Sequence, residues 1–328
     1  MSKTDRRGFL RAAVSGAALG AGAMAPRATA AEAAAKVDRR TLGRTGAPVS
    51  IYGLGLGSAF LGAYVDDFDS ADALLRRAVD VHGINYWDTA SSYSAKNKAG
   101  KVIFSQELVG RTVPAVRDKV FLVTKSGNRT YDGFKRDVEN SLKLLKTDRI
   151  DLYHMHNLDP KVDLDAMERG CVKAARELKE QGVIKHYGVT GHTNAACLIA
   201  AIKRFDPDCV MTTFPAGRPD QGRFEDELLP LAVERKMGAI AMKVFRQARA
   251  ADIKGVDLIR YALSLKGICV AIAGIDSVPH LDDNAKMAAG FKPLERAERA
   301  ALNARVQVAL ADETAPWLRP GYRDGVLV

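Results

Sequence analysis

Residues 120–156 read VFLVTKSGNRTYDGFKRDVENSLKLLKTDRIDLYHMH, two short apolar runs joined by a longer amphipathic segment. The runs at 120–125 and 150–156 have the length and composition of buried strands. Between them, residues 134–148 place apolar side chains at three- and four-residue spacing, which predicts a helix. A strand, a helix and a second strand in this order predict one parallel βαβ unit.

The same alternation continues through most of the chain. Further apolar runs bring the number of expected strands to eight; they lie at 49–57, 84–90, 184–192, 209–214, 238–245 and 268–274. Eight such units over about 300 residues fit a closed (β/α)8 TIM barrel better than an open doubly wound sheet, so we expect one α/β domain. Gly53, Gly55 and Gly57 do not complete the G-x-G-x-x-G fingerprint of a Rossmann fold, which agrees with this choice.

The first 30 residues differ from the rest in composition. TDRRGFLR (4–11) supplies a paired arginine in a basic region, a Gly- and Ala-rich run follows from Ala12 to Ala25, and a triplet of small residues ends the segment. This order resembles a twin-arginine (Tat) signal peptide, whose translocation machinery carries folded proteins. We expect residues 1–30 to be cleaved on export, to the periplasm or otherwise out of the cytoplasm, and residues 31–328 to form the mature barrel. A frayed basic tail and a retained anchor are the alternatives, although the run is too short for a stable membrane anchor.

Charge and cysteine content exclude some classes of partner. The net charge is +10, and it falls to +6 without residues 1–30, which hold five basic residues and one acidic residue. No stripe of Arg and Lys with interleaved aromatics is present, so we expect no nucleic-acid partner. The four cysteines never form Cys-x-x-Cys. We expect them to be buried apolar side chains, and we expect no metal site.

Four titratable side chains fall at or just after expected strand ends. Asp88, Lys125 and His156 end the second, third and fourth strands, and Tyr93 follows Asp88 in a loop. Because the strand ends of such a barrel open on one face, we expect the four to converge. An ammonium beside Tyr93 would lower the pKa of its hydroxyl from about 10, and His156 would orient a carbonyl oxygen. Such a site protonates an oxygen, and a cofactor must supply the electrons because no activated nucleophile is visible.

Several stretches together resemble the aldo-keto reductase family, from about Arg39 to Asn284. They are RTLGRTGAPVS followed by GLGLG, NYWDTASSY, VFLVTKSG, DVENSLKLLKTDRIDLYHMHNLD, LKEQGVIKHYGVTG and AIAGIDSVPHLDDN. The resemblance implies that Asp88, Tyr93, Lys125 and His156 form the family's catalytic tetrad, with Tyr93 as the acid. It favours His156 over His154, which shares its strand face. It also implies a nicotinamide cofactor across the barrel mouth, NADP(H) by default and NAD(H) as the alternative.

The resemblance also points to residues that would bind the cofactor, with departures from the family pattern. Thr190 keeps a hydroxyl for the nicotinamide carboxamide, but the usual Asn beside it is absent unless His192 replaces it. Stacking on nicotinamide would fall to Met242 or Phe214, and a carboxylate at Asp276 would repel a 2′-phosphate. The expected cofactor residues are Gly57, Thr190, His192, Phe214, Lys243, Phe245, Arg246, Asp276, Ser277, His280, Asp283 and Asn284.

We therefore expect an exported NAD(P)(H)-dependent oxidoreductase that interconverts an aldehyde or ketone with the alcohol. Two alternatives stay open: a cofactor-binding or partner-binding protein with little turnover, and a non-redox lyase or isomerase that uses Tyr93 and Lys125. The tail at 311–328, with Trp317, Arg319 and Tyr322, either folds over the barrel mouth or packs elsewhere.

Overall fold

The structure is a computed structural model that describes residues 36–217, 223–245 and 253–327. The expected export signal at residues 1–30 lies outside the described residues, and so does Arg246.

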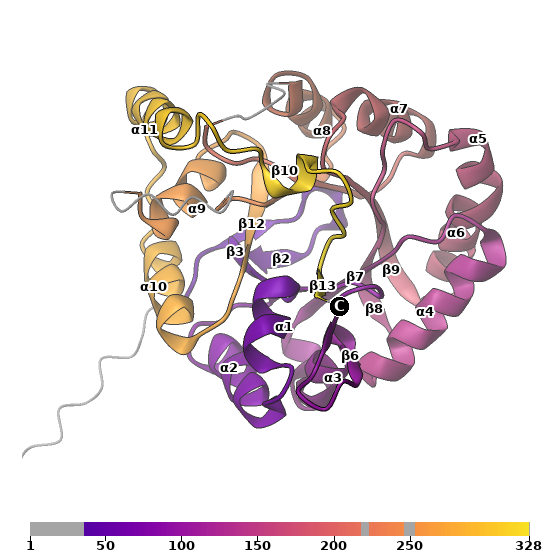
Figure 1. The fold of residues 1–328 in the computed structure, drawn as a ribbon. Helices are drawn as coiled ribbons and strands as arrows, with labels where there is room; N and C mark the ends of the chain where they lie inside the picture. Colours follow the sequence, from indigo (N-terminus) through magenta and orange to yellow (C-terminus); the bar gives the residue numbers. More distant parts are fainter. Residues whose placement is uncertain (1–35, 218–222, 246–252, 328) are drawn as a thin grey trace, which may run out of the picture. The chain divides into compact units, whose positions relative to one another are not determined.

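Eight parallel strands close into a barrel in the order β3, β4, β7, β8, β9, β10, β11, β12 (Figure 1). Each apolar run expected to be a strand supplies one of them, so the predicted (β/α)8 barrel is confirmed. The first run divides at Ile51, because its start forms an antiparallel hairpin with the preceding residues. The bounds are β1 (Arg39–Thr41), β2 (Pro48–Ser50), β3 (Tyr52–Gly55), β4 (Tyr86–Asp88), β7 (Phe121–Ser126), β8 (Ile150–Met155), β9 (Ile184–Gly191), β10 (Cys209–Thr213), β11 (Gly238–Met242) and β12 (Ile268–Gly274).

Helices surround the barrel. In α4, the buried side chains Phe134, Val138, Ser141 and Leu145 recur at three- and four-residue spacing and face the strands. The helices are α1 (Ser58–Tyr64), α2 (Phe68–Asp80), α3 (Ser105–Val116), α4 (Tyr131–Leu145), α5 (Leu164–Met167), α6 (Lys173–Glu180), α7 (Ala195–Phe205), α8 (Leu229–Glu234), α9 (Gly255–Leu263), α10 (Val278–Ala289) and α11 (Arg296–Ala309). Among the described residues, none of the helices has the length and apolarity needed to cross a membrane.

Alternate positions along the strands fill the barrel interior. Tyr86, Val123 and Leu152 belong to one buried apolar cluster, which is separate from the larger cluster between strands and helices. Because side chains alternate along a strand, Asp88 and Lys125 lie on the same face as Tyr86 and Val123, two residues nearer the strand ends. The interior therefore changes from apolar to charged at the mouth.

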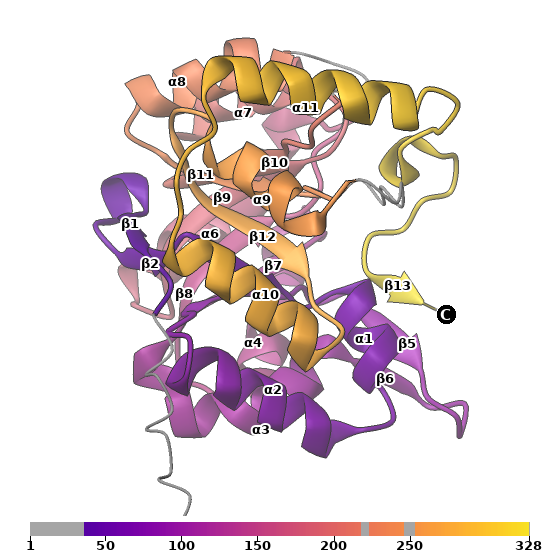
Figure 2. The ribbon, with the colours of Figure 1, turned by 90° about the vertical axis from the view of Figure 1, so that its left-hand side faces the viewer.

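The chain returns to the mouth after α11, where it crosses the ring of strands as a yellow trace (Figure 1). Its last strand, β13 (Val326–Leu327), adds in parallel to β5 (Ser94–Lys96), which pairs with β6 (Val102–Phe104) in a small sheet. Figure 2 shows this sheet at the end of the barrel opposite the β1–β2 hairpin. The C-terminal tail thus lies where the barrel strands end.

Candidate active site

The buried ion pair of Lys125 and Asp88 is the base of the site. Lys125 Nζ lies 2.6 Å from Asp88 Oδ2 and also donates to the carbonyl of Thr89 at 2.8 Å. The two side chains are 1% and 2% exposed, so neither charge is solvated by bulk water. Lys125 Nζ is 3.4 Å from the Tyr93 hydroxyl and 4.9 Å from the centre of its ring. The structure brings these three residues together at the mouth.

His156 completes the set from the end of β8. Its ring lies edge-on to Tyr93, with 6.1 Å between the ring centres. His154 lies deeper in the barrel, and neither of its ring nitrogens has a hydrogen-bond partner among the described residues. A side chain at Gly188 would collide with that ring at 2.4 Å, so the neighbouring strand needs glycine there. His154 is thus a packed interior residue, and His156 is the histidine that reaches Tyr93.

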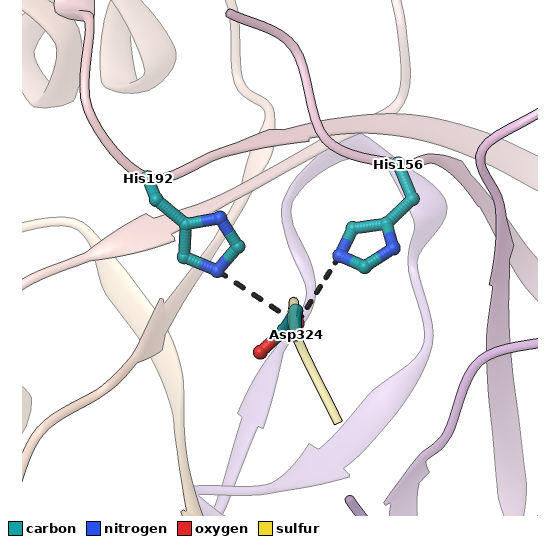
Figure 3. A group of neighbouring side chains, drawn as sticks. All are labelled: His156, His192 and Asp324. Carbon is teal, nitrogen blue, oxygen red and sulfur yellow. Dashed lines mark hydrogen bonds and ion pairs between the residues drawn. The ribbon is translucent and has the colours of Figure 1, made fainter. Parts of the chain in front are cut away.

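A tail residue that the sequence did not single out, Asp324, occupies the centre of the site. One of its oxygens, Oδ2, accepts a hydrogen bond from the Tyr93 hydroxyl at 2.7 Å and lies 3.2 Å from His156 Nε2. The other, Oδ1, accepts from Lys243 Nζ and from the Tyr322 hydroxyl. Figure 3 shows the carboxylate between His156 and His192, whose Nε2 is 3.8 Å away. The side chain of Asp324 is 7% exposed.

The electrostatics around Tyr93 differ from the expectation. Burial, followed by the carboxylates of Asp324 and Asp88, raises the pKa of Tyr93 well above its ordinary value of 10. The expected lowering by Lys125 is therefore wrong for this arrangement, because burial disfavours the phenolate and Asp324 accepts a hydrogen bond from the Tyr93 hydroxyl. Burial also raises the pKa of Asp88 to about 6, although Lys125 opposes the change.

The two histidines are neutral at neutral pH. Burial lowers the pKa of His156 despite the carboxylate of Asp324, and burial lowers the pKa of His192 to about 3. Burial alone would raise the pKa of Asp324, but the charge of Lys243 and the His156 contact outweigh it and hold the pKa well below its ordinary range. The centre of the site is thus a carboxylate held by a cation and by neutral donors.

His156, His192 and Asp324 could in principle hold a metal ion, since their ligand atoms lie within 4.8 Å of one another. However, both oxygens of Asp324 already accept hydrogen bonds from other side chains. The ammonium groups of Lys125 and Lys243 also lie beside this trio and would repel a divalent cation. We therefore treat the three residues as a hydrogen-bonded cluster.

Two hollows extend from the tetrad along one side of the mouth. A cavity of about 250 Å³ is lined by Asp88 and Tyr93, by the ends of β3, β11 and β12, and by tail residues that include Trp317 and Tyr322. A groove of about 1090 Å³ lies between α9 and α10 and shares Ala59, Phe245 and Gly274 with the cavity. The two are therefore continuous and have room for an elongated ligand.

The expected cofactor residues are distributed over these hollows unevenly. Gly57, Lys243 and Phe245 line the cavity, and Asp276, His280, Asp283 and Asn284 line the groove. His280 is paired with Asp276 at 2.6 Å, and Asn284 donates to the hydroxyl of Tyr52.

The remaining expected residues lie apart from the lining of the hollows. Ser277 caps α10, and Phe214 packs against Phe224. His192 Nδ1 lies 2.8 Å from Asn157 Oδ1, and Thr190 Oγ1 is buried without a hydrogen-bond partner in the described chain.

Sequence reasoning missed several residues of the hollows. Lys254, Lys286 and Lys292 line the groove, and Asp324 lies on the tetrad. Lys254 immediately precedes α9, Lys286 lies in the last turn of α10, and Lys292 lies in the loop after that helix. Surface charge is ordinary at such positions, so no feature of the sequence singled them out. The only signal for Asp324 was its place in GYRDG, between two glycines.

The fold and the site together define a class, the (β/α)8 barrels with Asp, Tyr, Lys and His converging at the mouth. The model of the Aldo/keto reductase family matches residues 53–255. The chain belongs to that family, which confirms the resemblance inferred from the motifs.

Individual relatives and structures agree with this assignment. Pyridoxal 4-dehydrogenase of Microbacterium luteolum is 30% identical over 258 residues, which cover 66% of this chain and 73% of that protein. The uncharacterized oxidoreductase YqkF of Bacillus subtilis (strain 168) is 31% identical over 215 residues, or 62% of this chain and 63% of that relative's length, which is less than two thirds. The crystal structure of PA4992 from Pseudomonas aeruginosa has a TM-score of 0.62 and 29% identity, and the match covers 79% of this chain and 97% of that one.

Proposed function

We propose that the chain is an NAD(P)(H)-dependent oxidoreductase that interconverts an aldehyde or ketone with the corresponding alcohol. One observation carries this proposal. A single oxygen, Asp324 Oδ2, lies within hydrogen-bond distance of both the Tyr93 hydroxyl and His156 Nε2. Donors in this arrangement stabilise an oxygen that gains negative charge during a reaction. A substrate carbonyl oxygen placed there would face the same two donors.

Each residue of the site has a distinct role in carbonyl reduction. Tyr93 donates its proton to the oxygen, while the ammonium of Lys125, 3.4 Å away, stabilises the phenolate that remains. Asp88 holds Lys125 in place through the 2.6 Å ion pair. His156, neutral because of its burial, donates to the same oxygen and fixes its position. A bound nicotinamide dinucleotide supplies the hydride that these residues lack.

The residues along the cavity and groove fit such a dinucleotide. Thr190 Oγ1 lies apart from the lining of the hollows, and, being buried without a partner among the described residues, it would be the donor for the carboxamide. At Gly274, between cavity and groove, a Cβ would approach Ala59 to 2.9 Å, so glycine keeps the passage open. Lys254 and Lys286 place positive charge along the groove. Their charge favours NADP(H), because it would attract the 2′-phosphate that NAD(H) lacks. Asp276 in the same groove would repel that phosphate, so NAD(H) stays the alternative.

We further propose that the protein is exported by the twin-arginine route to the periplasm. The support is the sequence TDRRGFLR, the Gly- and Ala-rich run and the small residues after it. Because this route carries folded proteins, the barrel can capture its dinucleotide before transport.

A second candidate function has one observation in its favour. Asp324 occupies the oxygen position, and the carboxylate cannot share that position with a substrate. A cofactor-binding or partner-binding protein with little turnover would keep such a closed site.

The test is a measurement of bound dinucleotide and of its oxidation with a panel of carbonyl compounds. We expect turnover, and we expect Tyr93→Phe to lower kcat by about 10²- to 10⁴-fold without loss of dinucleotide binding. Tyr131→Phe is the matched control and should keep its activity, because the Tyr131 hydroxyl donates to Glu177 on α6 and hydrogen-bonds none of the tetrad. Dinucleotide binding without turnover in the unaltered protein would support the second candidate. Equal turnover in Tyr93→Phe would refute the assigned role of Tyr93.

A further inference from the structure

Among the described residues, no carboxylate of the barrel itself forms an ion pair with Lys243. Lys243 directly follows β11 with a positive φ of 57°, and its ammonium pairs with Asp324 and with the Tyr322 hydroxyl at 2.6 Å. In the described ranges 36–217, 223–245 and 253–327, Asp324 is the only carboxylate within ion-pair distance of Lys243. The cation at the mouth thus has its counterion on the tail.

Asp324 and a substrate would compete for the same donors. The Tyr93 hydroxyl has one proton, and it already donates that proton to Asp324 Oδ2. Gly325, next to Asp324, packs directly on the Tyr93 ring, where even a Cβ would come within 2.0 Å. A carbonyl can therefore reach Tyr93 only after this part of the tail leaves.

Departure of the tail leaves two vacancies of different character. The position of Oδ2 is surrounded by Tyr93 and His156, the donors for a carbonyl oxygen. The position of Oδ1 adjoins Lys243, which then lacks its counterion. A neutral aldehyde fills the first position only, and it brings no counterion to Lys243. A ligand with a carbonyl oxygen and an anionic oxygen side by side fills both.

Building on the proposed function, we propose that the site takes 2-oxo acids and their 2-hydroxy acid products, and that Asp324 is a tethered stand-in for them. In a planar 2-oxo acid, the ketone oxygen and one carboxylate oxygen lie on adjacent carbons and point to the same side. They thus offer two neighbouring acceptor oxygens, as the carboxylate of Asp324 does from a single carbon. The ketone oxygen takes the place of Oδ2, and the carboxylate takes the place of Oδ1 on Lys243. In reduction, C2 gains the hydride of NAD(P)H, the ketone oxygen gains the Tyr93 proton, and the carboxylate is unchanged.

The test measures binding of oxamate, a non-reducible analogue of a 2-oxo acid, to the full chain by calorimetry, with and without NADP(H). We expect Lys243→Met to weaken oxamate binding by at least about 30-fold, and Lys243→Arg to retain most of it. Asp324→Asn should tighten binding by roughly 10-fold, because the tail competes less well. Lys119→Met removes an exposed lysine paired with Asp80 at the other end of β7 and should change nothing.

The outcomes separate this inference from the proposed function. Oxamate affinity that is unchanged in Lys243→Met, or not tightened in Asp324→Asn, overturns the inference. A loss of NADP(H) affinity in Lys243→Met with unchanged oxamate affinity assigns Lys243 to the cofactor phosphates and also overturns it. Reduction of a neutral aldehyde is measured in parallel: if it proceeds while oxamate does not bind, the inference fails and the proposed function stands. If oxamate binding depends on Lys243 but no carbonyl is reduced, the carboxylate site stands and the proposed activity fails.

Discussion

Substitution of Gly325 by alanine should release the C-terminal tail from the mouth without unfolding the barrel. Gly325 has a φ of 68°, in the left-handed region, and a Cβ there would lie 2.0 Å from Cδ1 of Tyr93. The Tyr93 ring has little room to withdraw, because the ammonium of Lys125 lies over the ring at 4.9 Å and Gly57 packs against its other edge. The collision must therefore be relieved by movement of the tail.

The free energy by which Gly325→Ala destabilises the bound tail has two separable contributions. A left-handed conformation costs an alanine about 1–2 kcal/mol relative to glycine. Overpacking against the Tyr93 ring adds about 1–3 kcal/mol. Gly321, in the same tail, has a φ of 77° but no atom within 4 Å of its Cβ position, so Gly321→Ala carries only the first cost. The two variants should differ by about 1–3 kcal/mol, or roughly 5- to 150-fold in the released fraction.

Hydrogen exchange provides the assay. The amide of Ser94 donates to the carbonyl of Gly325 at 3.1 Å, so its protection reports whether β13 is paired with β5. We expect the Ser94 amide to exchange faster in Gly325→Ala than in Gly321→Ala, by the roughly 5- to 150-fold difference in the released fraction. The amide of Leu122, inside the barrel on β7, should stay equally protected in both. Equal exchange of Ser94 in the two variants would refute the collision argument, since they share the backbone cost.

The remaining predictions concern stability and export. Although burial alone would raise the pKa of Asp208, the His186 ring, 3.7 Å away, and the hydrogen bond from Lys179 outweigh it and lower the pKa from 3.8 to about 2. Its stabilisation is thus complete above pH 3.8 and is lost as the pH falls toward 2, so Asp208→Asn should lower the free energy of unfolding by about 2 kcal/mol at pH 7 and by progressively less below pH 4. Denaturant titrations across this range measure the difference, and a deficit independent of pH would contradict the assignment. For export, replacement of Arg6 and Arg7 by lysine should retain the protein in the cytoplasm if the signal is read as a twin-arginine signal. Cell fractionation tests this, and undiminished export would argue against that route.

The barrel could be predicted from the sequence because its determinants are local. Each strand is a short apolar run, and each helix has a periodic face, as in Phe134, Val138 and Leu145 of α4. The positions of Asp88 and Lys125 followed as well, since a residue at the end of a barrel strand is fixed by the strand itself. The barrel topology alone was enough to predict that Asp88 and Lys125 converge at the mouth.

The place of Asp324 could not be predicted in this way. Its hydrogen bond joins residues 231 positions apart, and the tail that carries it has no periodic pattern to direct it. The position of Asp324 depends on two contacts of the tail: the two-residue pairing of β13 with β5, and the packing of Gly325 against the Tyr93 ring. Contacts of that kind depend on the finished fold, so neither composition nor spacing reveals them. The wrong direction for the pKa of Tyr93 has a related origin, because neither the burial of its hydroxyl nor the carboxylate of Asp324 was anticipated.

The tail therefore affects the pKa of Tyr93 as well as the access of a substrate to its hydroxyl. With Asp324 in place, the Tyr93 proton is held by a carboxylate, and the negative charge raises the pKa of Tyr93 beyond the effect of burial. Departure of the tail removes that charge while the ammonium of Lys125 stays 3.4 Å from the hydroxyl. The pKa of Tyr93 must then move down, toward the range in which a phenol is a useful proton donor. A 2-oxo acid brings its own carboxylate to Lys243, one carbon farther from Tyr93 than that of Asp324. The exchange of one ligand for the other thus opens the oxygen position and strengthens the acid in a single step.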